Sequence, residues 1–130
     1  MSRLTLTALG LLILRVGLAS MMLFGHGLPK LLSFSSLSGK FADPLGVGHL
    51  PSLCLALVGE VLCTVLLGLG FYARIAAAGA ATTMLVAAGI VHAGDPFAKK
   101  ELALAYCLGF LALALVGPGR WSLDAGRGRA

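Results

Sequence analysis

Six ionisable side chains that lie within or near the ends of long apolar stretches, where charged groups are uncommon, are candidates for a polar site: Arg15, His26, Lys30, Glu60, His92 and Glu101. Arg15 and Glu60 each fall about ten residues inside a stretch, about 15 Å deep at the rise of an α-helix. A charge near the middle of a bilayer costs at least ~2.5–3.5 kcal/mol to insert, and such residues usually pair or line a cavity. We therefore expect Arg15 and Glu60 to pair at the floor of a buried polar site.

The other four residues are expected at one mouth of this site. His26 follows Arg15 by three helical turns and shares its face. Lys30, His92 and Glu101 lie near helix ends on the side opposite the termini. An imidazole can shuttle protons near neutral pH, although a histidine at a membrane edge is also a common interfacial residue. No H-x3-H or E-x-x-H spacing occurs, so no metal site is predicted. An ion pair that only fixes helix register is the alternative.

The composition indicates a membrane protein. Apolar residues make up 58% of the 130 residues, 18 more are glycine, and 12% are charged, against ~25% charged residues in soluble domains. A soluble domain of this length has too little interior to bury so much apolar surface. A soluble enzyme, a disordered chain and a secreted disulfide scaffold are therefore excluded. The ten basic residues are scattered, which is typical of membrane-edge anchors and not of nucleic-acid binding.

Four apolar segments predict transmembrane helices, at about residues 4–28, 50–69, 74–93 and 101–116. Pro29 is expected to end the first helix, because proline cannot continue a helix without losing a hydrogen bond. Apolar side chains at helical spacing predict a short amphipathic helix at the membrane surface over residues 31–42, either an ordinary surface segment or a lid over the bundle. The predicted fold is all-α, an integral membrane four-helix bundle that forms a single domain over residues 1–130.

Charges and small residues limit how these helices are arranged. Both termini are predicted on one side with five basic residues, against four on the other, so the positive-inside rule favours cytoplasmic termini by one residue. The third segment is rich in alanine and glycine, which predicts a central helix or a contact between copies of the chain. Cys54, Cys63 and Cys107 form no C-x-x-C motif and are expected to be inert packing residues.

Several short motifs together resemble the DoxX family. Leu14-Arg15-Val16-Gly17 and Gly25-His26-Gly27-Leu28-Pro29-Lys30 resemble its first helix, and Gly59-Glu60 with Leu67-Gly68-Leu69-Gly70 and Arg74 resembles its second helix and turn. The ending Gly117-Pro118-Gly119-Arg120-Trp121-Ser122-Leu123-Asp124 is similar to the family's G-P-G-R-aromatic-S-L-D signature. The resemblance implies a four-helix membrane bundle and membrane redox work, because the related DoxD type is a subunit of thiosulfate:quinone oxidoreductase. It brings no catalytic residue with it.

Three functions follow as alternatives. The first is a small membrane subunit of a redox system that binds a quinone or similar molecule. Arg15, His26 or Lys30 would hydrogen-bond the quinone carbonyls, and Glu60 or His92 would relay protons. The second is an anchor or assembly subunit with a structural polar core, and the third is a small proton-coupled transporter, which would need two copies.

The expected surroundings follow from the same residues. The partners are the lipid bilayer and either other redox proteins or a second copy of the chain, in a bacterial cytoplasmic (inner) membrane. No covalently bound cofactor is predicted, and a quinone is the expected small molecule. Without a redox cysteine pair or a haem or flavin motif, whether the chain is itself an enzyme stays open.

Overall fold

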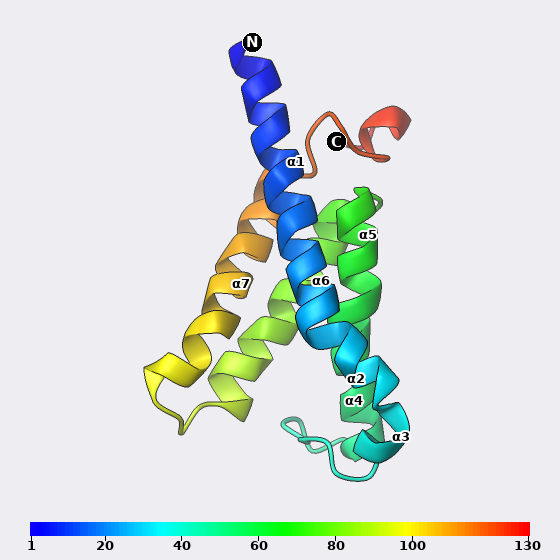
Figure 1. The fold of residues 1–130 in the computed structure, drawn as a ribbon, viewed down its shortest axis with the longest axis vertical. Helices are drawn as coiled ribbons and strands as arrows, with labels where there is room; N and C mark the ends of the chain where they lie inside the picture. Colours follow the sequence, from blue (N-terminus) through cyan, green and yellow to red (C-terminus); the bar gives the residue numbers. More distant parts are fainter.

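Helix extends through almost all of the apolar sequence in the computed structural model, which describes residues 1–130 and contains no strand. Four long helical rods run up and down (Figure 1). The first comprises α1 (Arg3–Met22), the π-helical segment η1 (Leu23–Gly27) and α2 (Leu28–Leu32). The second comprises α4 (His49–Leu57), the π-helical segment η2 (Val58–Leu62) and α5 (Cys63–Leu69). The third joins α6 (Ala73–Val86) to the π-helical segment η3 (Ala87–Val91), and the fourth is α7 (Phe97–Val116).

Three of these rods are long and apolar enough to cross a membrane, namely Arg3–Leu32, His49–Leu69 and Ala73–Val91, with 30, 21 and 19 residues. α7 has 20 residues, but its first turns carry Lys99, Lys100 and Glu101. The predicted all-helical membrane fold is confirmed with three candidate spans. A fourth crossing, by α7, stays a prediction.

The expectation that Pro29 ends the first helix is wrong, because the helix continues through α2 to Leu32. In η1 the backbone hydrogen bonds span five residues, and the N–H of Leu28 donates to the carbonyl of Leu23. This change of pattern places Pro29 in the first turn of α2, where a missing N–H costs least. The helix therefore carries Lys30 onward as an ordered helical residue.

The amphipathic segment is shorter than expected. α3 (Phe34–Leu37) is a single helical turn, and the chain then turns at residues 38–40 and forms an irregular loop before α4. Gly39 and the Asp43-Pro44-Leu45-Gly46 turn account for this end, since glycine and proline favour turns over helix. The residues after Phe41 consequently fold as a loop beside the bundle.

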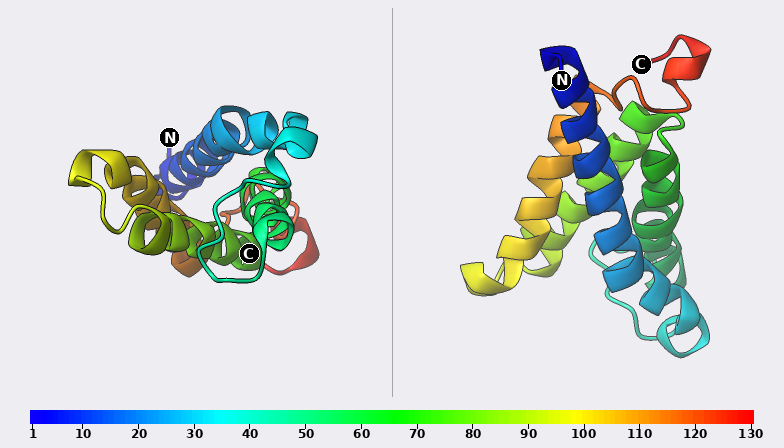
Figure 2. Two further views of the ribbon diagram at one scale, coloured as in Figure 1. Left: turned by 90° about the horizontal axis from the view of Figure 1, so that it is seen from below. Right: turned by 45° about the horizontal axis from the view of Figure 1, so that its top comes forward.

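α6 lies at the centre of the packing, between α5 on one side and α7 on the other (Figure 2). Its inward face is made of small buried side chains, among them Ala77 and Ala80, which belong to the same core cluster as the buried Phe110 and Leu113 of α7. Small residues let helices approach closely. Of the two positions predicted for this alanine-rich segment, the structure shows the central one.

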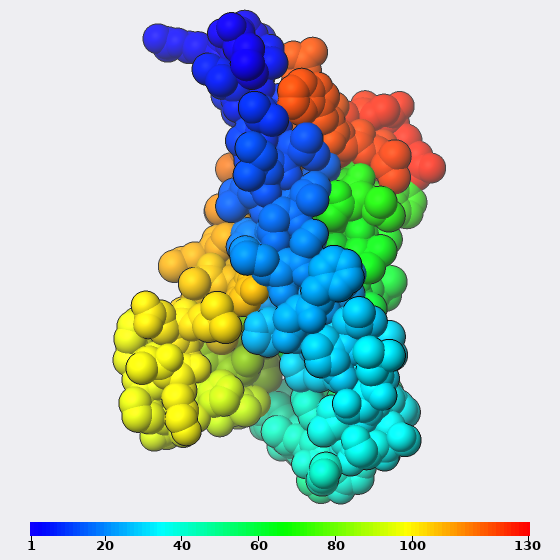
Figure 3. Space-filling view, viewed as in Figure 1, coloured from blue at the N-terminus to red at the C-terminus, as the bar shows by residue number.

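Both termini lie at the same end of the bundle, and α1 extends beyond the other rods at that end (Figures 1 and 2). At the opposite end, the start of α7 (yellow) stands apart from the region of α2 and α3 (cyan) in the space-filling view (Figure 3). Below, the two ends are called the terminus end and the loop end. The chain therefore has a closed end beside its termini and a more open loop end.

Candidate ligand-binding site

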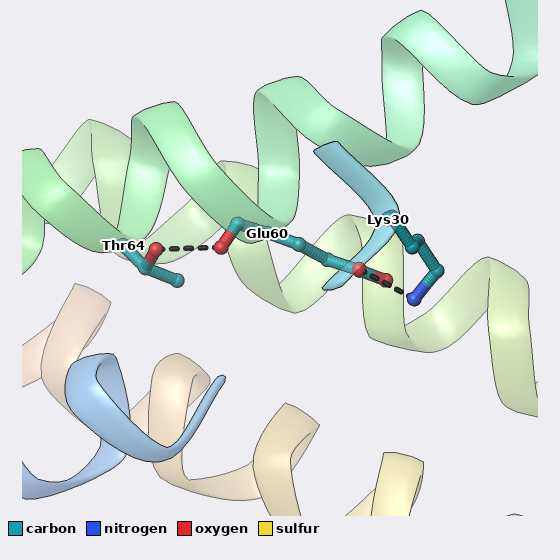
Figure 4. Close-up of polar contacts among 3 residues, drawn as sticks. All are labelled: Lys30, Glu60 and Thr64. Atoms are coloured by element: carbon teal, nitrogen blue, oxygen red, sulfur yellow. Dashed lines mark hydrogen bonds and ion pairs between the residues drawn. The ribbon is translucent and has the colours of Figure 1, made fainter. Parts of the chain in front are cut away.

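The one ion pair between long helical rods joins Lys30 of α2 to Glu60 of η2. Lys30 Nζ lies 2.7 Å from Glu60 Oε2 (Figure 4). The side chain of Glu60 is 8% exposed and that of Lys30 is 26% exposed. A charged carboxylate buried to this degree needs a partner, because transfer out of water costs several kcal/mol per ion. Glu60 also carries a hydrogen bond on its backbone, where Thr64 Oγ1 donates to its carbonyl oxygen at 2.7 Å.

π-Helical segments and glycines bring the backbones together around Glu60. η1 packs against η2, and a Cβ atom on Gly27 would meet the carbonyl oxygen of Glu60. One step earlier in η2, a Cβ atom on Gly59 would meet the hydroxyl of Thr83 on α6. Short π-helical insertions are frequent at functional sites. Here the rods that contain η1, η2 and η3 all contribute residues to the wall of one cavity, which is described next.

A cavity of about 520 Å³ lies beside this ion pair, between α4, η2, α6 and the loop before α4. Its walls are mainly apolar, with Phe41, Leu55 and Val86 among the lining residues, and Lys30, Glu60 and His92 also line it. Thr82 and Thr83 donate their hydroxyl protons to carbonyls of their own helix, at 2.8 and 3.1 Å. Their oxygen lone pairs therefore remain free to accept hydrogen bonds from a ligand.

The loop over residues 41–48 covers one side of the cavity, to which Phe41, Ala42, Pro44 and Leu45 contribute. Asp43 holds this loop in shape. Its carboxylate accepts hydrogen bonds from the N–H groups of Val47 and Gly48, both at 2.9 Å, and from Ser52 Oγ at 2.8 Å. The hydrogen bond from Ser52, helped by the two backbone N–H groups, holds the pKa of Asp43 below its usual 3.8. Sequence analysis missed this residue, although an Asp-Pro-x-Gly turn followed by a serine is the signal that marks it.

Comparison with known proteins agrees with this architecture. The DoxX family model matches residues 10–93. The chain belongs to the DoxX family. The matched region contains Lys30, Glu60 and the three π-helical segments, while the ending at residues 117–124 lies beyond it. No curated protein and no solved structure gives a significant match to the chain.

The expected Arg15–Glu60 pair is wrong for this DoxX protein. Arg15 is 2% exposed, and its Nη2 donates to the backbone carbonyl of Trp121 at 2.8 Å, at the terminus end. Its guanidinium occupies the space that a side chain on Gly70 would fill. Gly70 follows Glu60 by ten residues, about 15 Å along the helix. The depth of Arg15 was overestimated because α1 begins well outside the rest of the bundle (Figure 1).

The remaining predicted site residues are divided between several environments. His92 lines the cavity, and its Nδ1 lies 2.7 Å from Asp95 Oδ2, a contact that chiefly holds the pKa of Asp95 below 3.8. His26 does not line the cavity; it packs edge-on against Tyr106 of α7, with ring centroids 5.7 Å apart. Glu101 is exposed, and no hydrogen bond or ion pair involves its side chain. The structure thus brings together Lys30, Glu60 and His92, without Arg15, His26 or Glu101.

The cysteines and the possible metal-binding side chains do not form a second candidate site. Cys54 is exposed, Cys63 is half-buried and Cys107 is buried, and all three are free thiols. No three His, Cys, Asp or Glu side chains come close enough to hold a metal ion. Cys63 packs beside Gly79, where a Cβ atom would lie 2.8 Å from its Sγ.

The signature-like ending ties the helix ends together. The carboxylate of Asp124 accepts hydrogen bonds from the N–H groups of Tyr72 and Ala73, at 2.9 and 2.8 Å, and so caps the first turn of α6. Arg74, in the first turn of α6, donates hydrogen bonds to the backbone carbonyls of Ala114 and Val116 and so caps the end of α7. Both contacts match the helix dipoles, which favour an anion at a helix start and a cation at a helix end.

Proposed function

We propose that this DoxX protein binds a quinone, or a similar apolar molecule with carbonyl oxygens, in the cavity beside Lys30 and Glu60. The observation that carries this proposal is an apolar cavity with a buried ion pair in its wall, within a membrane protein. Ligand sites are typically apolar spaces of ~300–1,000 Å³ with a few placed polar groups. A cavity of about 520 Å³ accommodates a quinone ring.

Lys30 and Glu60 have complementary roles in this proposal. A lysine ammonium has three N–H donors, of which Glu60 takes one, so the others are free to donate to a ligand carbonyl. Reduction of a quinone to a quinol takes up two electrons and two protons. Glu60, which is a carboxylate in its pair with Lys30, would first take up a proton from water by way of His92 and Asp95 and would then pass it to the ligand. The electrons would come from a partner redox protein, of which this chain would be the membrane subunit.

The membrane arrangement belongs to the same proposal. If α7 crosses the membrane as the fourth span, both termini lie on one side, in agreement with their common end in Figure 1. Lys99, Lys100 and Glu101 would then sit at the opposite interface, where long charged side chains reach water. The arginines of the terminus end favour its placement on the cytoplasmic side of a bacterial inner membrane.

Filling the cavity tests the proposal directly. Ala56 lines the cavity, and we expect Ala56→Phe to abolish binding of a short-chain quinone titrated into the detergent-purified protein. Leu108→Phe, on an exposed site of α7, is the matched control and should bind as the parent does. Equal binding by the two variants would place the quinone outside the cavity.

An anchor or assembly subunit is the second candidate, and one contact favours it. The Lys30–Glu60 pair lies where Gly27 touches the backbone of Glu60, so the pair would also hold two rods in register. In that case the double variant Lys30→Met/Glu60→Leu keeps its fold and its partner, and the parent shows no quinone binding.

A further inference from the structure

The terminus end of the molecule carries a large excess of positive charge. Six arginines lie there, namely Arg3, Arg15, Arg74, Arg120, Arg127 and Arg129, with Asp124 as the one acidic side chain. The other four acidic side chains, Asp43, Glu60, Asp95 and Glu101, are at the loop end or in the cavity. Both ion pairs of the structure also lie away from the terminus end. These arginines therefore have no protein carboxylate to neutralise most of their charge.

A small pocket of about 180 Å³ lies among these arginines, between the start of α6 and the C-terminal segment. It is bordered by Tyr72, Ala73, Arg74, Ile75, Asp124 and Arg129. The Asp124 carboxylate is already engaged by two backbone N–H groups, and it interacts electrostatically with the buried Arg15 behind it. Its negative charge remains, and Arg74 already donates to the carbonyls at the end of α7. The free guanidinium N–H groups at the pocket are therefore those of Arg129 and of its neighbour Arg127.

Two of the arginines are held in place on aromatic rings. The guanidinium carbon of Arg127 lies 4.6 Å from the ring centroid of Phe71, and that of Arg129 lies 5.0 Å from the ring centroid of Tyr72. Such contacts contribute ~0.5–1 kcal/mol at exposed sites and restrict the side chain. Because the guanidinium edges stay free, their N–H groups can bind an anionic oxygen in two-pronged fashion.

We propose that this pocket, here called the arginine pocket, binds the phosphate of an anionic phospholipid. Basic pockets of membrane proteins on the cytoplasmic side bind such headgroups. Ile75, which also borders the pocket, is 72% exposed, and Tyr72 is 45% exposed. These apolar surfaces continue from the arginines along α6, where an acyl chain attached to the phosphate would lie. The charge excess selects an anion, and the neighbouring apolar surface selects a lipid over a free ion.

Native mass spectrometry of the detergent-purified chain with phosphatidylglycerol and phosphatidylcholine tests this proposal. We expect the parent to prefer phosphatidylglycerol, and Arg127→Gln/Arg129→Gln to bind it about 25-fold more weakly, since each of the two basic residues near a lipid surface contributes about fivefold. Lys99→Gln/Lys100→Gln removes the same charge at the loop end and should leave binding unchanged. No preference in the parent, or an equal loss in the control, would overturn the proposal.

Two further measurements keep the test decisive if the glutamine variant does not fold. Raising the salt concentration from about 0.05 to about 0.5 M should weaken phosphatidylglycerol binding to the unmodified chain, because salt screens exposed charges. Unchanged binding at high salt would contradict the proposal. Millimolar inorganic phosphate should leave the bound lipid in place, and displacement of the lipid by phosphate would show a site for a free ion instead.

Discussion

Lys30 and Glu60 differ in exposure, and this difference decides what each contributes. Glu60 is nearly enclosed, whereas the ammonium group of Lys30 keeps partial contact with its surroundings. A buried carboxylate without its partner is expensive, while an apolar pair in its place is often neutral for stability. The pair itself therefore adds little net stability, although the loss of either partner alone is costly.

Removal of one partner should be costly. We expect Lys30→Met to lower the free energy of unfolding by on the order of 2–3 kcal/mol, below the ~3–5 kcal/mol of a fully buried pair because Lys30 is 26% exposed. Lys30→Met/Glu60→Leu should recover most of the loss. Detergent-induced unfolding followed by circular dichroism measures both variants, and a double variant less stable than the single one would contradict this interpretation.

Lys30, Glu60 and Arg15 also show how far single residues could be placed from sequence. The burial of Glu60 was predicted because a carboxylate within an apolar stretch must be buried. Its partner was not, because Pro29 hides the continuation of the helix that carries Lys30. Arg15 was correctly expected to be buried, but its depth depends on how far α1 extends past its neighbours, which no local pattern in the sequence records.

At the scale of elements, the π-helical segments determine how closely the first two rods approach. η1 contains two glycines with opposite surroundings. A Cβ atom on Gly27 would meet the backbone of Glu60, whereas a Cβ atom on Gly25 would meet nothing within 4 Å. A substitution at Gly25 therefore reports only the change in helix propensity, whereas a substitution at Gly27 also reports the contact with the backbone of Glu60.

Alanine at these two positions should therefore give different outcomes. We expect Gly27→Ala to cost about 1–3 kcal/mol, the usual cost of overpacking, and to weaken quinone binding because the Lys30–Glu60 pair is pushed apart. Gly25→Ala should be neutral or slightly stabilising, since alanine is the better helix former. Thermal unfolding in detergent checks both variants. Equal stability of the two would show that the close approach of η1 and η2 is not needed.

The loop over residues 41–48 should respond to acid through Asp43. Its pKa is lowered in the folded loop, chiefly by the Ser52 hydrogen bond, so the contribution of Asp43 is fully present above pH 3.8 and is lost as the pH falls below it. We expect cleavage within this loop by a protease that is active in acid to rise as the pH falls below 3.8 in the parent, while trypsin at neutral pH should cut the parent poorly at Lys40. Asp43→Asn should be cleaved readily at neutral pH, and an equally protected variant would contradict the role of Asp43.

The positions of the helices could be predicted from the sequence, but the residues that line the cavity could not. The helix positions were predicted to within a few residues, because long apolar stretches define them. Thr82, Thr83 and Phe41 were not singled out, since nothing in the sequence separates a residue that lines a cavity from its neighbours in the same helix or loop. The amphipathic helix was predicted to be longer than it is, because the helical spacing of apolar residues continues through the turn at Gly39.

At the scale of the whole molecule, the charges are divided between the two ends. Arginines gather at the terminus end, and acidic side chains gather at the loop end and in the cavity. Asp124 and Arg74 hold the terminus end closed by capping α6 and α7. At the loop end, the start of α7 (yellow) stands apart from the region of α2 (cyan) in the space-filling view (Figure 3). This asymmetry places the cavity at the more open end and the arginine pocket at the closed end.

The most direct test of quinone binding is solvent extraction and mass spectrometry of the protein purified in mild detergent. Lys30→Met/Glu60→Leu is compared with the parent and with Glu101→Gln, a control that removes an exposed carboxylate away from the cavity. We predict near-stoichiometric quinone in the parent and in Glu101→Gln, and little in the double variant. Equal traces in all three folded proteins would contradict the proposal, and the ion pair would then serve only to pack the helices.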